Sequence, residues 1–126
     1  MTKVNNEEEL ARAVNEEREE IEIEISFLRE FTLKVKSKGK NVWLLAMACV
    51  AIMLVIAYKL QNSGGVTEAL KLPVAKRAIR LLGADTCASV LKMAIAGGGI
   101  HVLNDFRNNY YVSYRDKDKV IFKRKI

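Results

Sequence analysis

Residues 42–60 read VWLLAMACVAIMLVIAYKL, the most apolar stretch of the chain. From Val42 to Tyr58 it contains no charged residue, no proline and no glycine. An α-helix rises about 1.5 Å per residue, so about 20 residues cross a hydrocarbon core roughly 30 Å thick. A helix also satisfies its own backbone hydrogen bonds inside lipid, which irregular backbone does not do. We therefore predict a single transmembrane α-helix over residues 42–60. The alternative is a buried core helix of a soluble domain, which is typical of shorter apolar runs.

The two ends of this stretch carry the residues expected at a membrane interface. Trp43 lies at one end and Tyr58 at the other, and aromatic rings of this kind are enriched at headgroup level. Lys59 can extend its charged end outward along its aliphatic stem. These three residues are the predicted membrane anchors. Because residues 1–41 precede the stretch and begin with acidic residues, we expect a signal anchor and not a cleavable signal peptide.

Four lysines lie directly before the predicted span, at every second position: Lys34, Lys36, Lys38 and Lys40. The other flank has fewer cations near the span, so the positive-inside rule places the N-terminus in the cytoplasm of an integral membrane protein. Lysines at this position also attract anionic lipid, which makes them the predicted lipid contacts. An ordinary basic flank without lipid specificity explains the same pattern.

Residues 1–41 form the predicted cytoplasmic N-terminal arm. The acidic run that begins at Glu7 follows Asn5 and Asn6, either of which is a good N-cap for an acidic helix. After residue 20 the text EIEIEISF and then FTLKVKSK alternates apolar and polar residues, which predicts strands. Folding the two runs about Arg29 matches apolar pairs and opposite charges, so a hairpin over residues 21–38 is favoured. One long helix is the alternative, because apolar residues also recur every seven positions.

Residues 61–65, QNSGG, are predicted to be a linker. The rest, residues 66–126, is expected to be a small basic α+β region with two helices and a β-hairpin. Thr67 and Pro73 are helix-start signals, and Gly83 ends the first helical part. A second helix runs to Gly97. A short strand at residues 100–103 is expected next, and NNYYVSYR and VIFKRKI, separated by DKDK, predict the hairpin.

Residues 84–103 raise the question of a second, membrane-associated helix. The segment is long enough to cross but contains Asp85, Lys92 and His101, which are costly in mid-bilayer. A packed helix is favoured over a crossing. If the segment does cross, both predicted hairpins lie on the same side of the membrane and are able to form one four-stranded sheet.

The chain shows no motif for catalysis or for a cofactor. Gly97–Gly99 is not followed by the Lys-Ser or Lys-Thr of a phosphate loop. Cys87, His101 and Asp105 lack a fourth metal ligand at a usual spacing. No disulfide framework is expected from two cysteines of which one, Cys49, lies in the apolar stretch. We therefore expect neither an enzyme nor a cofactor nor a metal site.

The net charge of +6 is compatible with an anionic membrane surface or with nucleic acid. The first functional hypothesis is a small structural or assembly protein that anchors a larger complex, such as a membrane-associated assembly or the membrane layer of a virion, to a bilayer. Its expected partners are lipid and other protein subunits, with no small-molecule substrate. The alternatives are a pore-forming or lysis protein and a membrane-tethered nucleic-acid-binding protein, the latter because of the basic tail.

Overall fold

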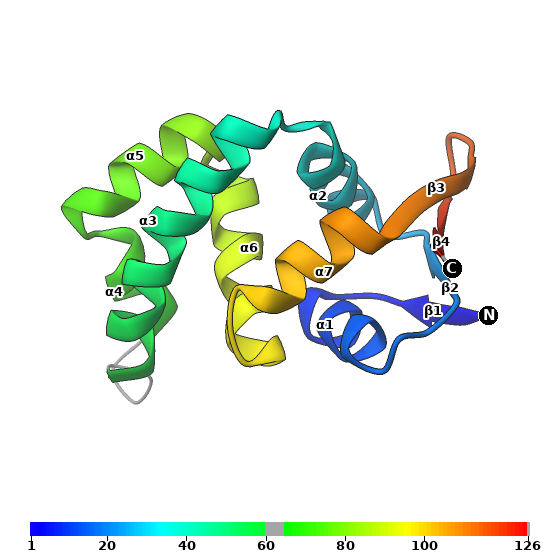
Figure 1. Cartoon of the computed structure of the whole chain (residues 1–126), viewed down its shortest axis with the longest axis horizontal. Helices are drawn as coiled ribbons and strands as arrows, with labels where there is room; N and C mark the ends of the chain where they lie inside the picture. The colour runs from blue at the N-terminus through cyan, green and yellow to red at the C-terminus, as the bar shows by residue number, and fades with distance from the viewer. Residues whose placement is uncertain (60–64, 126) are drawn as a thin grey trace.

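The computed structural model describes residues 1–59 and 65–125, and it is mostly helical with a small mixed four-stranded sheet. The elements in chain order are β1 (Thr2–Val4), α1 (Glu7–Asn15), β2 (Glu20–Ile23), α2 (Ser26–Ser37), α3 (Lys40–Lys59), α4 (Gly65–Leu70), α5 (Pro73–Leu82), α6 (Ala84–Gly97), α7 (His101–Asn109), β3 (Tyr110–Arg115) and β4 (Val120–Arg124). In Figure 1, α3, α4 and α5 lie on one side of the molecule. The sheet lies on the other side with α1 and α2, and α6 lies between the two parts.

The sheet joins the two ends of the chain. Its strand order is β1-β2-β4-β3, in which β1 pairs parallel to β2 and the other two pairs are antiparallel. Ile21 of β2 lies opposite Phe122 of β4, and Ile23 lies opposite Val120. All four side chains are buried, because alternate residues of a strand point to the same face. The N-terminal arm and the C-terminal region therefore share one sheet, and the two termini lie close together (Figure 1).

The hairpin predicted over residues 21–38 is wrong, and so is the single long helix. The first helix already ends at Asn15, and Glu17 has a left-handed backbone with φ 56°. Residues 20–23 do form a strand, but its antiparallel partner is β4. Residues 26–37 form α2, whose buried positions follow helical spacing: Leu28, Phe31, Thr32 and Val35. Burying this helical stripe outweighs the alternating pattern of the sequence. Phe27, which the alternating pattern places on the apolar face, is exposed in the helix.

The predicted N-cap of the first helix is confirmed at Asn6. Its side-chain oxygen accepts a hydrogen bond from the backbone N–H of Glu9 at 2.8 Å. In return, Glu9 Oε1 accepts one from the backbone N–H of Asn5, also at 2.8 Å. This reciprocal pair satisfies backbone donors that the first helical turn leaves free.

The C-terminal region contains more helix than predicted. Pro73 does begin a helix and Gly83 does follow its end. The strand predicted at residues 100–103 is wrong, because α7 begins at His101 and buries Val102, Leu103 and Phe106 at helical spacing. The predicted C-terminal hairpin is confirmed as β3 and β4. Of the predicted linker, residues 61–64 lie outside the described residues, and Gly65 begins α4.

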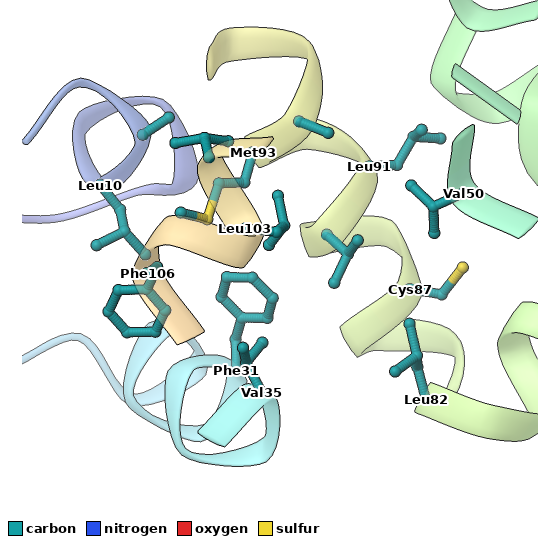
Figure 2. Close-up of a cluster of buried hydrophobic side chains, with 14 of the residues drawn as sticks. Leu10, Phe31, Val35, Val50, Leu82, Cys87, Leu91, Met93, Leu103 and Phe106 are labelled. Carbon is teal, nitrogen blue, oxygen red and sulfur yellow. The ribbon is translucent and has the colours of Figure 1, made fainter. Parts of the chain in front are cut away.

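Helix α6 connects the two parts of the core. Cys87 and Leu91 point toward Val50 of α3, whereas Met93 points toward Leu103 of α7 (Figure 2). All five of these side chains are fully buried. Since α6 packs on both sides, the segment predicted as a second membrane-associated helix is an interior helix of this fold.

Candidate membrane-contact surface

Helix α3 has two apolar faces, of which one is buried and the other is exposed. One face is buried against α4, α5 and α6. The opposite face follows the spacing of three and four residues that forms one stripe on a helix. We define this outer face of α3 by five exposed apolar residues: Leu44, Leu45, Ala48, Ile52 and Val55. Leu44, Ile52 and Val55 are 57%, 57% and 54% exposed. The outer face extends from Leu44 to Val55, which is about 17 Å along the 20-residue helix.

Among the described residues, α3 is the one helix that is long and apolar enough by itself to cross a membrane. The pair α6 and α7 reaches the same length and hydropathy only if both helices, bent by 107° at their junction, are counted as one segment. Core helices of soluble proteins meet the same criterion. The property that sets α3 apart is therefore its exposed apolar half, and not its composition alone.

Trp43, a predicted membrane anchor, lies inside the protein. Its side chain is only 2% exposed, and its indole N–H donates to Asn104 Oδ1 at 2.8 Å. The guanidinium carbon of Arg107 lies 5.4 Å from the ring centroid, within reach of a cation–π contact. The predicted lipid contact of Trp43 is thus replaced by protein contacts. The other two predicted anchors, Tyr58 and Lys59, are exposed at the far end of α3.

Lys36, one of the predicted lipid contacts, is half-buried. Its Nζ donates to the backbone carbonyl oxygens of Arg107 and Tyr110. Burial lowers the pKa of Lys36, and the nearby charges of Lys125 and Arg107 lower it further. This ammonium group therefore connects α2 to the α7–β3 junction instead of facing lipid.

The other three predicted lipid contacts do not form one cluster. Lys34 is exposed on α2, where it lines a cleft beside α6. Lys38 is half-buried between α2 and α3, and its carbonyl oxygen accepts from Arg107 Nη2 at 2.8 Å. Lys40 is exposed at the first position of α3. Only Lys40 therefore lies at an end of the outer face, where it is the counterpart of Lys59.

A second set of cations lies beside α3, which sequence reasoning did not place there. Lys76, Arg77 and Arg80 are exposed on α5, and α5 packs along α3. The sequence shows the amphipathic pattern of α5, but no local signal reveals which helix it packs against. Residues 40–82 contain six basic residues and one acidic residue, so they carry +5 of the total net charge of +6. A cation costs about 2.5–3.5 kcal/mol at the centre of a bilayer, so α5 is a poor membrane-spanning partner for α3.

A polar cleft of about 310 Å³ lies between α2, α6 and the start of α1. Glu7 lines it with only 8% exposure, and its Oε2 accepts a hydrogen bond from Ser89 Oγ at 2.8 Å. Acidic and basic side chains both line the cleft, including Asp85 and Lys92. This mixture of charges, with the one buried carboxylate already paired, favours no particular ligand.

The buried side chain of Cys87 is held as a thiol. Burial raises its pKa to about 11, with a smaller contribution from the Cys49 thiol. A thiol with this pKa is almost entirely un-ionised at neutral pH and is a weak nucleophile. His101 lies at the exposed start of α7, next to Gly99. Within residues 1–59 and 65–125, no three side chains of His, Cys, Asp or Glu gather as a metal site.

No protein-family model, no curated protein and no solved structure matches this chain.

Proposed function

We propose that this protein is a small, non-enzymatic structural or assembly component that attaches a larger complex to a lipid bilayer. The complex would be a membrane-associated assembly or the membrane layer of a virion. The observation that carries the proposal is the outer face of α3, an exposed apolar stripe from Leu44 to Val55 on a helix with Lys40 and Lys59 at its ends. We propose that this surface contacts lipid.

The energetic reason is the area that the fold leaves uncovered. Burying a large apolar side chain completely is worth about 1.5–3 kcal/mol relative to leaving it exposed. Each large residue of the outer face is about half exposed, so roughly half of this burial free energy is still to be gained at each of them. The sum is on the order of 5 kcal/mol. Contiguous exposed apolar surfaces on small proteins mark contacts with other proteins or with membranes. The cations at both ends of α3 and along α5 favour a membrane with anionic headgroups.

The sheet-bearing side of the molecule supplies the proposed contacts with other subunits. Strands β1 and β3 are the two edges of the sheet, and β3 is exposed along most of its length. Exposed edges pair readily with strands of another chain. We propose that this side of the protein faces the cytoplasm, because the cytoplasmic leaflet carries the anionic lipids that the cations of α3 and α5 favour.

Vesicle flotation tests the membrane contact. We expect the full chain to float with vesicles that contain anionic lipid. The double variant Ile52→Glu/Val55→Glu should lose flotation, because two charges on the outer face oppose burial in lipid. Phe27→Glu is the matched control, because Phe27 is an exposed apolar residue on α2. Equal flotation of all three proteins, or flotation of none, would contradict the proposal.

The assembly part of the proposal has a separate test. The detergent-solubilised protein should form oligomers or complexes at working concentration, measured by light scattering. A monodisperse, well-folded monomer would count against an assembly role while leaving the membrane contact intact.

A second candidate function is nucleic-acid binding by the C-terminal hairpin. Tyr111 and Tyr114 of β3 are exposed, and Arg115 and Lys117 lie close to them in sequence. Exposed aromatic rings beside cations are able to stack bases of single-stranded nucleic acid. The full chain should then bind an oligonucleotide with steep salt dependence, and Tyr111→Ala should weaken binding. Absence of binding at low salt would exclude this candidate.

A further inference from the structure

Pairing of β2 with β4 constrains how the chain meets a membrane. Strand β2 precedes α3 and β4 is the last strand of the described chain, yet the two pair along four residues of each, from Glu20 opposite Lys123 to Ile23 opposite Val120. Two strands of one sheet lie on the same side of a bilayer, because an open sheet edge is not tolerated inside hydrocarbon. If α3 crossed the membrane, a later segment would have to cross back before β3.

Neither candidate for a return crossing fits this fold. Helices α4 and α5 run along α3 but expose Lys76, Arg77 and Arg80, which would lie in the hydrocarbon next to it. Helices α6 and α7 are bent by 107° at their junction and bury their apolar side chains in the core, as Figure 2 shows for Met93 and Leu103. Sending them through a bilayer would dismantle the core that holds the sheet to α3.

If α3 lies in the plane of the membrane, β2 and β4 are on the same side of the bilayer and no return crossing is needed. The outer face of α3 is apolar over about 17 Å of helix, while the opposite face packs on protein. A helix placed in this way immerses one side in the boundary between headgroups and acyl chains. Lys40 and Lys59 at its two ends, and the cations of α5 beside it, remain at the depth of lipid phosphates. No part of the sheet needs to enter lipid.

We propose that α3 docks in the plane of one leaflet of an anionic bilayer and does not cross it. The outer face enters the upper acyl region, Lys76, Arg77 and Arg80 contact lipid phosphates, and both ends of the chain stay on one side. This inference rests on the proposed membrane contact, and it adds the mode of docking and the class of lipid.

The first test is the accessibility of the two ends on sealed anionic vesicles. The full chain carries a single added cysteine, either Lys3→Cys in β1 or Lys117→Cys in the β3–β4 turn, and a membrane-impermeant maleimide is added outside. The unmodified chain is the control for Cys49 and Cys87, which are both buried. In-plane docking predicts that both added cysteines react as fully before lysis of the vesicles as after it. Protection of one end until lysis would overturn in-plane docking and leave the proposed membrane contact standing.

The second test addresses the lipid class. Reversing the charge of two α5 cations, in Arg77→Glu/Arg80→Glu, should weaken binding to anionic vesicles by about tenfold or more, because each cation near the surface contributes to attraction. Lys92→Glu, an exposed lysine on α6, is the matched control and should leave binding nearly unchanged. Equal weakening by both variants, or by neither, would overturn the headgroup contact. A chain that binds no vesicle but dimerises through α3 would overturn in-plane docking together with the proposed function.

Discussion

Helices α3 and α6 are both rich in apolar residues, yet α6 is covered by protein on two sides and α3 on only one. Leu91 of α6 and Val55 of α3 illustrate the difference, because the first is fully buried and the second is more than half exposed. An apolar residue on α6 stabilises the fold, whereas one on the outer face of α3 is available for a contact with something else. Composition alone does not separate these two roles.

The largest expected difference is in stability. Leu91→Ala should lower the free energy of unfolding by about 2–5 kcal/mol, because it removes buried contacts and leaves a cavity. Val55→Ala should change it by no more than about 0.5 kcal/mol, since the side chain already faces outward. Chemical denaturation of the two variants without membranes measures both values. Similar losses would show that the outer face is buried in the free protein.

Alkaline pH should weaken the contact between α6 and α3. Burial raises the pKa of Cys87 from 9.0 to about 11. As the pH rises, the Cys87 thiol therefore ionises in the unfolded chain before it does so in the folded chain. Its contribution to the free energy of unfolding is complete below pH 9 and is lost as the pH rises to about 11. A shift of this size corresponds to roughly 2–3 kcal/mol. We expect Cys87→Ala to remove this part of the pH dependence in denaturation curves measured from pH 8 to 11, and an unchanged pH dependence would contradict it.

The junction of α6 with α7 should be sensitive to a single methyl group. A Cβ at Gly97 would lie 2.5 Å from Val102 Cγ1 and 2.7 Å from Val102 Cβ, which is too close for any contact. Gly97→Ala should therefore destabilise the protein by about 1–3 kcal/mol. Gly39→Ala, before α3, meets no atom within 4 Å and is the matched control. Equal melting temperatures for the two variants would show that the side chain of Val102 moves away from the added methyl group at little cost.

The smallest effect separates the two aromatic ends of α3. Trp43→Phe removes the hydrogen bond to Asn104 and should cost about 1 kcal/mol of stability without affecting vesicle binding. Tyr58→Ala should instead weaken vesicle binding and leave stability nearly unchanged, because Tyr58 is exposed. Denaturation and flotation of both variants check this. Weaker vesicle binding by Trp43→Phe, with unchanged binding by Tyr58→Ala, would show that Trp43 contacts the membrane interface.

Several elements were predictable because their signals are local. The apolar stretch, the cap at Asn6, the helix start at Pro73 and the C-terminal hairpin all depend on neighbouring residues. Helix α2 was missed because residues 21–36 satisfy a period of two as well as a helical stripe. The choice depends on a distant partner, since β2 pairs with β4, about one hundred residues away in sequence.

The candidate surface was predictable only in part. The sequence identifies α3 as apolar and Lys40, Tyr58 and Lys59 as its polar ends. It does not reveal that Trp43 faces Asn104, or which side of α3 the later helices cover. These are tertiary contacts between segments far apart in the chain, and neither spacing nor composition encodes them in a readable way.

The most direct test of the lipid contact is the fluorescence of a polarity-sensitive dye on the outer face of α3. The dye is attached at Val55→Cys, and at Phe27→Cys on α2 as the control. When anionic vesicles are added, emission from position 55 should shift to the blue and be quenched by lipids labelled in the upper acyl chain, while position 27 remains unchanged. An unchanged signal at position 55, or equal shifts at both positions, would contradict the proposed contact between α3 and lipid.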